Sequence, residues 1–467
     1  MEDSVNMAST SISLGTFSAN NNKKFTISFW IKRSKIGTEQ FIYYAGASGA
    51  NGALRFNTDN TLKWYNYAGS MNGEMVTYRR FMDVSSWYHI VLAVDTTQAT
   101  ASNRVKIYVN GVQETSFSTE SYPSQDAGMY INNSGDNQYI GFDSSSSYLE
   151  GSLSHFNFID NTQYAASDFG SFDSTDGIWK INTSPSVTYG TNGFYLKFED
   201  SSDMDKDSSG NGHTFSTSGN LMPNKDNPSN NLCSVNWSAL GMVDTTVDSN
   251  KNCGYTILIQ QSSFRANVGT LPVSAGKWYA EFKLRTATGS SGYSGMGVLN
   301  INPNPGDMSN QSDIRLGQYG NSVSYNSDGT VKRNDSTVRT DNTFTAGDII
   351  SVAMDLDNGF IYWAKNGTWE NSGDPTSGAT GTGGYAISNI LETGSAGGTD
   401  PGSYVMGVTG RVGSSSAPYF DVNYGNGWYN TTAIASPNSD GNGYGAFSYT
   451  VPTGYLTICT KNISTNG

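Results

Sequence analysis

The sequence carries little charge and has no long apolar run, and each absence excludes a class of protein. Charged residues make up 14% of the 467 residues, and the formal net charge of −13 at pH 7 repels phosphate backbones, so no nucleic-acid partner is expected. No apolar stretch approaches the roughly 20 residues of a transmembrane helix. Residues 1–14 also lack the charged start and apolar centre of a secretory signal. We therefore expect no membrane insertion and no export signal.

Cysteine is scarce as well. The three cysteines, an odd number without metal-ligand spacing, are Cys233, Cys253 and Cys459. This pattern suits neither a disulfide framework nor a metal site. We expect free thiols in a protein that folds in a reducing cytoplasm.

Glycine and tyrosine are abundant instead. The sequence has 53 Gly and 28 Tyr together with many Ser, Thr and Asn, a composition typical of short strands joined by turns. No segment shows sustained apolar spacing of 3.6 residues, so very little helix is expected. At 467 residues the chain should form at least two domains, because single cores stop growing near ~250–300 residues.

Strand patterns begin near the N-terminus. Residues 25–31 alternate between apolar and polar side chains, whereas residues 87–94 are apolar on both faces, as in a central strand covered on both sides. Residues 105–109 run into Asn110-Gly111, which predicts a hairpin because a type I′ turn needs positive φ at both central positions. Residues 150–158 form one more alternating strand.

The pattern weakens between about residues 160 and 232, except for the apolar island 194–198, which should pack as a strand on the first domain. Strands then return, and Asn358-Gly359 and Asn366-Gly367 predict two successive hairpin turns, hence a meander over residues 349–369. The strands predicted for this second part are residues 278–284, 296–299, 323–325, 349–356, 360–365, 404–408 and 419–422. Regular short strands of this kind indicate an all-β fold of two β-sandwich domains. We expect Trp278, Trp363 and Trp369 in the core.

Two sets of motifs resemble known families. Residues 87–91 (WYHIV), 104–111 (RVKIYVNG) and 149–153 (LEGSL) resemble the laminin-G or concanavalin A-like jelly roll. Residues 276–282 (GKWYAEF), 347–359 (GDIISVAMDLDNG) and 420–425 (FDVNYG) are similar to a SPRY domain. The resemblance implies a jelly roll over residues 1–175, a connector with one packed strand over 176–232, and a SPRY-like sandwich with a C-terminal extension over 233–467.

The combination of both domains resembles structural proteins of tailed phages, particularly marine and cyanobacterial ones. This resemblance implies a virion protein made in the host cytoplasm, with other virion proteins and a host surface glycan as partners. The chain begins almost at its first strand, so we expect neither a virion-anchoring domain nor a fibre shaft. Without a coiled coil or collagen repeat, any oligomer must form through the sandwiches. A homo-oligomer is expected, with a trimer as the preferred state.

Three functions remain open at this point. The first is a fibre tip, spike or head-fibre module that attaches to host glycan, and the second is a capsid decoration or tail adaptor that binds only virion proteins. The third is a polysaccharide depolymerase, which needs two carboxylates on one strand face. Glu150 and Glu281 each lack an acidic partner at that spacing, and no nucleophile elbow is present. His89, His155 and His213 are scattered, and His89 reads as a hydrogen-bonded core residue. We therefore predict that the protein is not an enzyme.

Aromatic side chains near turns are the candidate ligand contacts, because sugars stack their apolar faces on Tyr and Trp. In the first domain these lie near the turns 46–52 and 66–73, and core packing is an equal alternative for about half of them. They are Tyr43, Tyr44, Trp64, Tyr65 and Tyr67. The SPRY-like resemblance implies recognition by loops, which here include Tyr293, Arg315, Trp369 and Tyr419.

Acidic residues give two candidate calcium sites. Asp203, Asp205 and Asp207 alternate along a turn-rich loop, the spacing at which carboxylates collect around a hard cation, although a plain solvated turn explains them as well. The laminin-G resemblance implies a second candidate at Asp136 and Asp143, which flank residues 139–142. No other cofactor is predicted.

Overall fold

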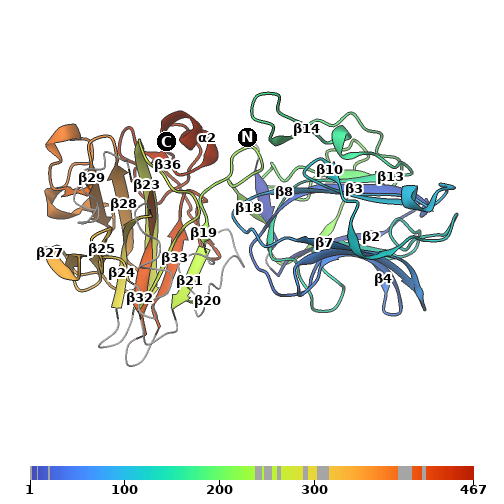
Figure 1. Cartoon of the computed structure of the whole chain (residues 1–467), viewed down its shortest axis with the longest axis horizontal. Coiled ribbons are helices and arrows are strands. Elements are labelled where there is room, and N and C mark those ends of the chain that lie inside the picture. The colour runs from blue at the N-terminus through green and yellow to red at the C-terminus, as the bar shows by residue number, and fades with distance from the viewer. Residues whose placement is uncertain are drawn as a thin grey trace. The chain divides into compact units, whose positions relative to one another are not determined.

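The chain forms two compact units, residues 1–229 (unit 1) and 230–467 (unit 2), and each is described by itself. The computed structural model describes residues 3–7, 9–18, 21–235, 264–287, 293–301, 315–387, 402–412 and 417–467, and the backbone alone at 236, 245–246 and 255–259. Both units are β-sandwiches (Figure 1), so the all-β prediction is confirmed. Among the described residues the one α-helix is α2 (Thr460–Asn466). No helix in these ranges is long and apolar enough to cross a membrane.

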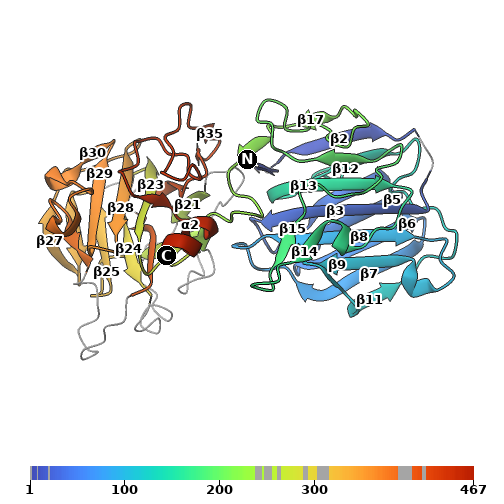
Figure 2. The ribbon, with the colours of Figure 1, turned by 90° about the horizontal axis from the view of Figure 1, so that it is seen from above.

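Two antiparallel sheets form unit 1 (Figure 2). The first sheet has the order β10 (Val112–Gln113), β9 (Val105–Val109), β8 (Tyr88–Asp95), β3 (Lys24–Arg33), β13 (Gly151–Asp160), β1 (Ser4–Asn6) and β18 (Met222–Asn224), with β16 (Phe194–Leu196) paired to β13. The second has the order β11 (Phe117–Ser121), β7 (Met71–Arg80), β6 (Thr61–Ala68), β5 (Ala50–Phe56), β4 (Gln40–Ala47), β12 (Asn137–Ile140), β2 (Ser11–Thr16) and β17 (Ser216–Ser218). The strands β14 (Gly170–Phe172) and β15 (Trp179–Ile181) form a separate two-stranded sheet.

Aromatic rings from both sheets fill the core of unit 1. Phe158 on β13 stacks on Tyr43 of β4 at 5.6 Å between ring centroids and on Phe194 of β16 at 5.4 Å. Alternation on β3 sends Phe25, Ile27 and Phe29 into the same core. The predicted strands 25–31 and 150–158 are therefore confirmed as β3 and β13.

Strand β8 is covered on both sides, as its apolar pattern predicts. Ile90 and Leu92 face the main core, whereas Val91 and Ala93 face a second cluster that includes Trp179 of β15. The hairpin after β9 is confirmed too, because Asn110 and Gly111 both have positive φ, 47° and 82°, and β10 pairs back onto β9.

His89 on β8 has both ring nitrogens engaged in the core. Trp179 Nε1 donates to its Nδ1 at 3.0 Å, so the ring proton sits on Nε2, which contacts Ser28 Oγ at 2.9 Å. Burial lowers the pKa of His89 to about 3. The prediction of a hydrogen-bonded core histidine is confirmed.

The predicted connector, residues 176–232, is not a separate segment, because unit 1 extends to Ser229. Strand β16 pairs with β13, as predicted for the apolar island, and β18 pairs with β1. The turn chemistry of this region hid the strands, since β17 and β18 are only three residues long.

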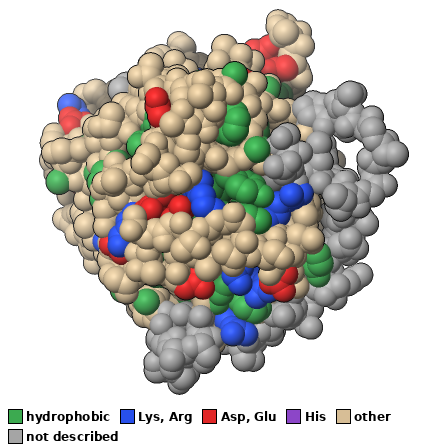
Figure 3. Space-filling model, turned by 90° about the vertical axis from the view of Figure 1, so that its left-hand side faces the viewer, with side chains coloured by type: hydrophobic (Ala, Val, Ile, Leu, Met, Phe, Trp, Pro, Cys, Tyr) green, Lys and Arg blue, Asp and Glu red, His purple; other side chains and the backbone are tan. Residues whose placement is uncertain are grey.

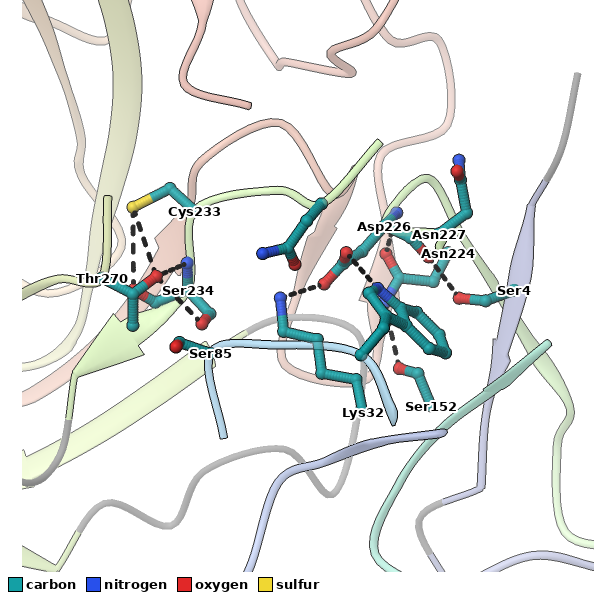
Figure 4. A network of polar contacts seen from close by, with 12 residues as sticks. Ser4, Lys32, Ser85, Ser152, Asn224, Asp226, Asn227, Cys233, Ser234 and Thr270 are labelled. Atoms are coloured by element: carbon teal, nitrogen blue, oxygen red, sulfur yellow. Dashed lines mark hydrogen bonds and ion pairs between the residues drawn. The ribbon is translucent and has the colours of Figure 1, made fainter. Parts of the chain in front are cut away.

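A buried ion pair holds the end of unit 1 to β3 (Figure 4). Lys32 Nζ lies 2.6 Å from Asp226 Oδ2, and their side chains are 5% and 1% exposed. Trp87 Nε1 donates to the other carboxylate oxygen at 3.0 Å, and the Ser4 hydroxyl donates to the Asp226 carbonyl. Asp226 thus connects the first, middle and last parts of the unit through its carbonyl and its carboxylate.

Unit 2 also has two main sheets. One has the order β19 (Val235–Asn236), β22 (Arg265–Gly269), β32 (Tyr404–Arg411), β24 (Tyr293–Asn300), β25 (Ser322–Asn326), β26 (Thr330–Arg333) and β27 (Ser336–Thr340). The other has the order β20 (Thr245–Thr246), β21 (Tyr255–Ile259), β33 (Tyr419–Asn423), β23 (Lys277–Thr286), β28 (Ile349–Asp355), β29 (Phe360–Lys365) and β30 (Thr368–Trp369), with β31 (Tyr385–Ala386) on β29 and β36 (Leu456–Thr457) on β23. The strands β34 (Trp428–Tyr429) and β35 (Thr432–Ala433) form a separate pair.

The core of unit 2 follows the sequence pattern closely. The meander β28–β29–β30 is confirmed, and the predicted strands 278–284, 404–408 and 419–422 lie within β23, β32 and β33. Trp278 and Trp363 are buried in the core as predicted, whereas Trp369 is half-buried on the outer face of the sheet, so its assignment to the core is wrong. Cys233 and Cys459 are free thiols, and Cys253 lies outside the described residues.

We predict that acid destabilises unit 1 through its buried histidines. Unfolded histidine takes a proton near pH 6.5, but His89 and His155 both have a folded pKa of about 3 because burial disfavours the cation. The unfolded chain therefore binds more protons below pH 6.5. The contribution of each histidine to the free energy of unfolding is fully present above pH 6.5. It falls by about 1.4 kcal/mol per pH unit as the pH is lowered towards 3.

Urea unfolding between pH 7 and pH 4 measures how the free energy of unfolding depends on pH. His89→Gln should make this dependence shallower by the contribution of one histidine. Equal slopes for wild type and His89→Gln would contradict the prediction.

We also predict that Asp226→Asn destabilises unit 1 by about 3–5 kcal/mol, because it removes the negative charge beside a buried ammonium group. Asp176→Asn is the matched control, since Asp176 pairs with Lys180 at the surface and its loss should change the unfolding free energy little. Chemical denaturation of the two variants compares how much the Lys32–Asp226 and Lys180–Asp176 pairs contribute to the free energy of unfolding. Similar unfolding midpoints would show that the Lys32–Asp226 pair does not hold the unit together.

Candidate functional site

A row of tyrosines crosses the outer face of the second sheet of unit 1. In the strand register Tyr139 of β12 pairs with Tyr44 of β4, Tyr44 with Ala53 of β5, and Ala53 with Tyr65 of β6. Paired residues of antiparallel strands point to the same face. These rings pack with Phe41 into one cluster over Ala53, in which Tyr65 and Tyr139 remain partly exposed. We call Tyr44, Tyr65 and Tyr139 the tyrosine row.

Strand alternation divides the predicted ligand residues of unit 1 into two groups. Tyr43 and Trp64 point inward and are 0% and 1% exposed, so the prediction that they contact a ligand is wrong. Tyr44 and Tyr65 point outward, and Tyr67 follows Tyr65 on the same face, opposite Asn51 of β5. The segments read as turns at 46–52 and 66–73 are largely strand, which is why the sequence pattern did not separate the groups.

Charged side chains surround the rings of this face. The guanidinium of Arg55 lies 5.2 Å from the ring centroid of Phe41 and 5.6 Å from that of Tyr65, and Lys63 Nζ lies 5.2 Å from Tyr65. Burial raises the pKa of Tyr65 to about 12, so its hydroxyl stays neutral at physiological pH. Two ion pairs fix the charged groups, Arg55–Glu39 and Lys63–Glu74.

The loop after β12 borders this face and includes the predicted metal ligand Asp143. Tyr139 meets Phe142 edge to face at 6.1 Å, and Phe142 stacks on Tyr148 at 4.5 Å. The Asp143 carboxylate accepts the backbone N–H groups of residues 145, 146 and 147 at 2.8–2.9 Å. Asp143 therefore shapes the loop beside the tyrosine row, and Asp136, the second residue of this candidate, accepts the side-chain amide of Asn133 instead.

The carboxylates of the other calcium candidate, Asp203, Asp205 and Asp207, do not point to one common position either. Asp207 accepts backbone N–H groups from Tyr195 at 3.0 Å and His213 at 3.0 Å, so it ties its turn to β16. Asp203 is exposed and Asp205 half-buried. In the described part of the chain, no three Asp, Glu, His or Cys side chains gather as metal ligands would.

In unit 2 the structure brings Tyr293 and Arg315 together. Phe264 lies between two guanidinium groups, with Arg315 4.4 Å and Arg411 4.5 Å from its ring centroid, and Tyr293 meets Phe264 edge-on at 5.0 Å. Arg315 also pairs with Asp335. Phe264 and Arg411 were missed from the sequence, because nothing local links residues so far apart in the chain.

The remaining two predicted residues of unit 2 lie elsewhere. The Tyr419 ring is covered by the guanidinium of Arg285 at 4.5 Å, and Arg285 pairs with Asp421. Trp369 lines a separate cavity of unit 2. On the face of unit 2 in Figure 3, basic and acidic side chains lie side by side with hydrophobic ones between them, so the net negative charge of the chain is not concentrated there.

Comparison with known proteins agrees with the fold. Residues 6–166 match the family model described as the concanavalin A-like lectin/glucanases superfamily, so unit 1 has the laminin-G or concanavalin A-like lectin fold. None of the curated proteins compared with the chain matches it.

Solved structures with similarity to the chain include both lectin-like and SPRY domains. The mouse laminin alpha1 chain domains LG4-5 share 9% identity over 90% of this chain and 86% of theirs, with a TM-score of 0.30. The SPRY domain of human HERC1 shares 13% identity over 40% of this chain and 92% of its own, with a TM-score of 0.27. A putative carbohydrate binding protein from Bacteroides ovatus shares 15% identity over 48% of this chain and 59% of its own, with a TM-score of 0.30.

Proposed function

We propose that the chain is a non-enzymatic carbohydrate-binding protein that holds saccharide on the tyrosine row of unit 1. The row itself carries the proposal, because it places aromatic rings side by side on the outer face of a lectin-fold sheet. The C–H faces of sugar rings stack on such aromatic surfaces.

The charged groups around the row suit the edges of a sugar. Arg55 and Lys63 offer N–H donors, and Glu39 and Glu74 offer acceptors, each held in place by its ion pair. Sugar hydroxyls both donate and accept, so groups of both kinds at fixed positions select the orientation of a ring. Such preorganisation lowers the entropy that binding costs.

The same ion pairs argue against hydrolysis. Glycoside hydrolysis needs a carboxylic acid and a carboxylate facing each other across the scissile bond. Of the carboxylates beside the row, Glu39 and Glu74 are each bonded to a cation, and Asp143 accepts backbone N–H groups of its own loop. Glu281 of unit 2 is buried and accepts hydrogen bonds from two tyrosine hydroxyls. Binding without cleavage is therefore the function that we propose.

We further place this binding on the surface of a tailed-phage particle, with a host surface glycan as the target and a homo-oligomer, preferably a trimer, as the assembled form. The support is the resemblance of the motif combination at residues 87–153 and 276–425 to virion structural proteins. Repetition of a weak saccharide site in an oligomer raises its avidity without new contacts.

Tyr65→Ala should weaken saccharide binding about tenfold or more, because stacking on an aromatic ring contributes around 1 kcal/mol or more beyond the area that is buried. Glycan arrays would identify the ligand, and calorimetry would measure the change in affinity. Tyr78→Ala on β7 is the matched control, since Tyr78 is 67% exposed and lies outside the row. Equal losses in both variants, or unchanged binding in Tyr65→Ala, would contradict the proposed site.

Mass spectrometry of purified phage particles tests the location. The protein should be present in every particle, and the full chain should bind host cells in a manner that free glycan competes. Presence in the particle without binding to cells or glycans would favour the adaptor function, and absence from particles would overturn the virion proposal.

A further inference from the structure

Unit 2 has a cavity of about 470 Å³ on the outer face of the β23–β28–β29–β30 sheet. It lies between two segments distant in sequence, the turn that follows β30 and the chain segment 449–453. Its volume is within the range of small-molecule sites, roughly 300–1,000 Å³. The lining includes Tyr279, Ser351, Trp369, Asp374, Tyr449 and Pro452.

Two aromatic rings line the cavity. Trp369 is held by the pairing of β30 with Ala364 of β29. Tyr449 packs directly on Gly367, where an added Cβ would lie 2.6 Å from its ring and where φ is +82°. Only glycine allows this close approach of ring and backbone. Both rings are half-buried, so each keeps a surface for a ligand.

Hydroxyl groups form the polar part of the lining. The Tyr279 hydroxyl contacts Glu281 Oε1 at 3.0 Å and Ser351 Oγ at 2.8 Å. Tyr279 is the donor in both contacts, so its one phenol proton is shared between Glu281 Oε1 and Ser351 Oγ. Ser351 is 1% exposed and Tyr279 is fully buried, so these hydroxyl groups form the floor of the cavity.

Buried Glu281 holds the cavity in shape. Its carboxylate accepts the backbone N–H of Ser448 at 2.8 Å, that of Tyr449 at 2.9 Å and the hydroxyl of Tyr429 at 2.6 Å. The segment that carries Tyr449 is thereby fixed to β23. On the opposite side the Tyr455 hydroxyl donates to the Pro375 carbonyl at 3.0 Å. Both walls of the cavity, segment 449–453 and the turn after β30, are therefore preorganised for a ligand.

The lining chemistry selects the ligand. Asp374 is the charged residue of the lining, and neither Lys nor Arg takes part in it. An anionic ligand would meet a carboxylate without a compensating cation. Aromatic rings with hydroxyl and carboxylate acceptors suit instead a neutral ring that has apolar C–H faces and hydroxyl edges.

We propose that the Trp369–Tyr449 cavity is a second saccharide site, which binds one neutral sugar unit in unit 2. It is independent of the tyrosine row of unit 1, so the chain has two saccharide sites of different shape. The row is an open surface that accepts an extended chain, whereas the cavity accepts a terminal sugar.

Saturation-transfer NMR with the full chain and a panel of neutral mono- and disaccharides tests this site. Trp369→Ala and Tyr449→Ala should each weaken binding of the cavity ligand about tenfold or more. Tyr444→Ala, a half-buried tyrosine of unit 2 outside the cavity lining, is the matched control and should leave binding unchanged. Circular dichroism and the unfolding midpoint verify that each variant is folded, and two separate variants keep the test valid if one fails.

A cross-test separates the two sites. The Tyr65→Ala variant should bind the cavity ligand as tightly as the wild type does. Trp369→Ala should likewise bind the ligand of the tyrosine row with unchanged affinity. Binding that survives both cavity variants, or that depends on Tyr65 alone, would overturn the second site and leave the first intact. A wild-type chain that binds no neutral sugar in unit 2 would overturn it as well, whereas loss in both cavity variants but not in Tyr65→Ala supports it.

Discussion

Successive side chains of a β-strand point to opposite faces, and this alternation decides which aromatic residue of either unit is core and which can meet a ligand. Neighbours in sequence take opposite roles: Tyr43 fills the core of unit 1 while Tyr44 joins the outer row, and Trp64 and Tyr65 divide in the same way. A shift of one residue in the pairing of β4 or β6 would exchange every one of these roles. The packed core therefore fixes the ligand face, because it fixes the register.

Much of the fold follows from local pattern. Alternating strands such as residues 25–31, the Asn110-Gly111 turn and the meander at 349–369 were predictable because each depends on neighbours in sequence. The strands β5 and β6 were not recognised, since glycines and asparagines at 46–52 and 66–73 resemble loop sequence although they lie largely in strands. In residues 176–229 only the apolar island that forms β16 was predicted, because β17 and β18 are three residues long and pair with the distant strands β2 and β1.

The candidate sites were less accessible from sequence. Register brings Tyr139 beside Tyr44, almost 100 residues away. Phe264, Arg315 and Arg411 meet across three segments, and the Trp369 cavity needs Tyr449 from a segment whose place depends on Glu281. Glu281 stands out in the sequence as a single acidic residue in an apolar strand, but its partners Tyr429, Ser448 and Tyr449 lie more than 140 residues further on. The sequence therefore identified several candidate residues, but it did not identify the residues that lie beside them in the folded chain.

Buried polar groups join the end of each unit to its earlier strands. Asp226 connects to Lys32 and Trp87 in unit 1, while in unit 2 Glu281 holds Ser448 and Tyr449, and β36 runs parallel to β23. During synthesis the ribosome releases residues 281 and 32 long before their partners. Lys32 and Glu281 therefore lack these partners until the last part of each unit has been synthesised. A chain that stops before residue 448 lacks β36 and the segment that is bonded to Glu281, so the surface of an incomplete copy differs from that of a finished one at the outer face of β23.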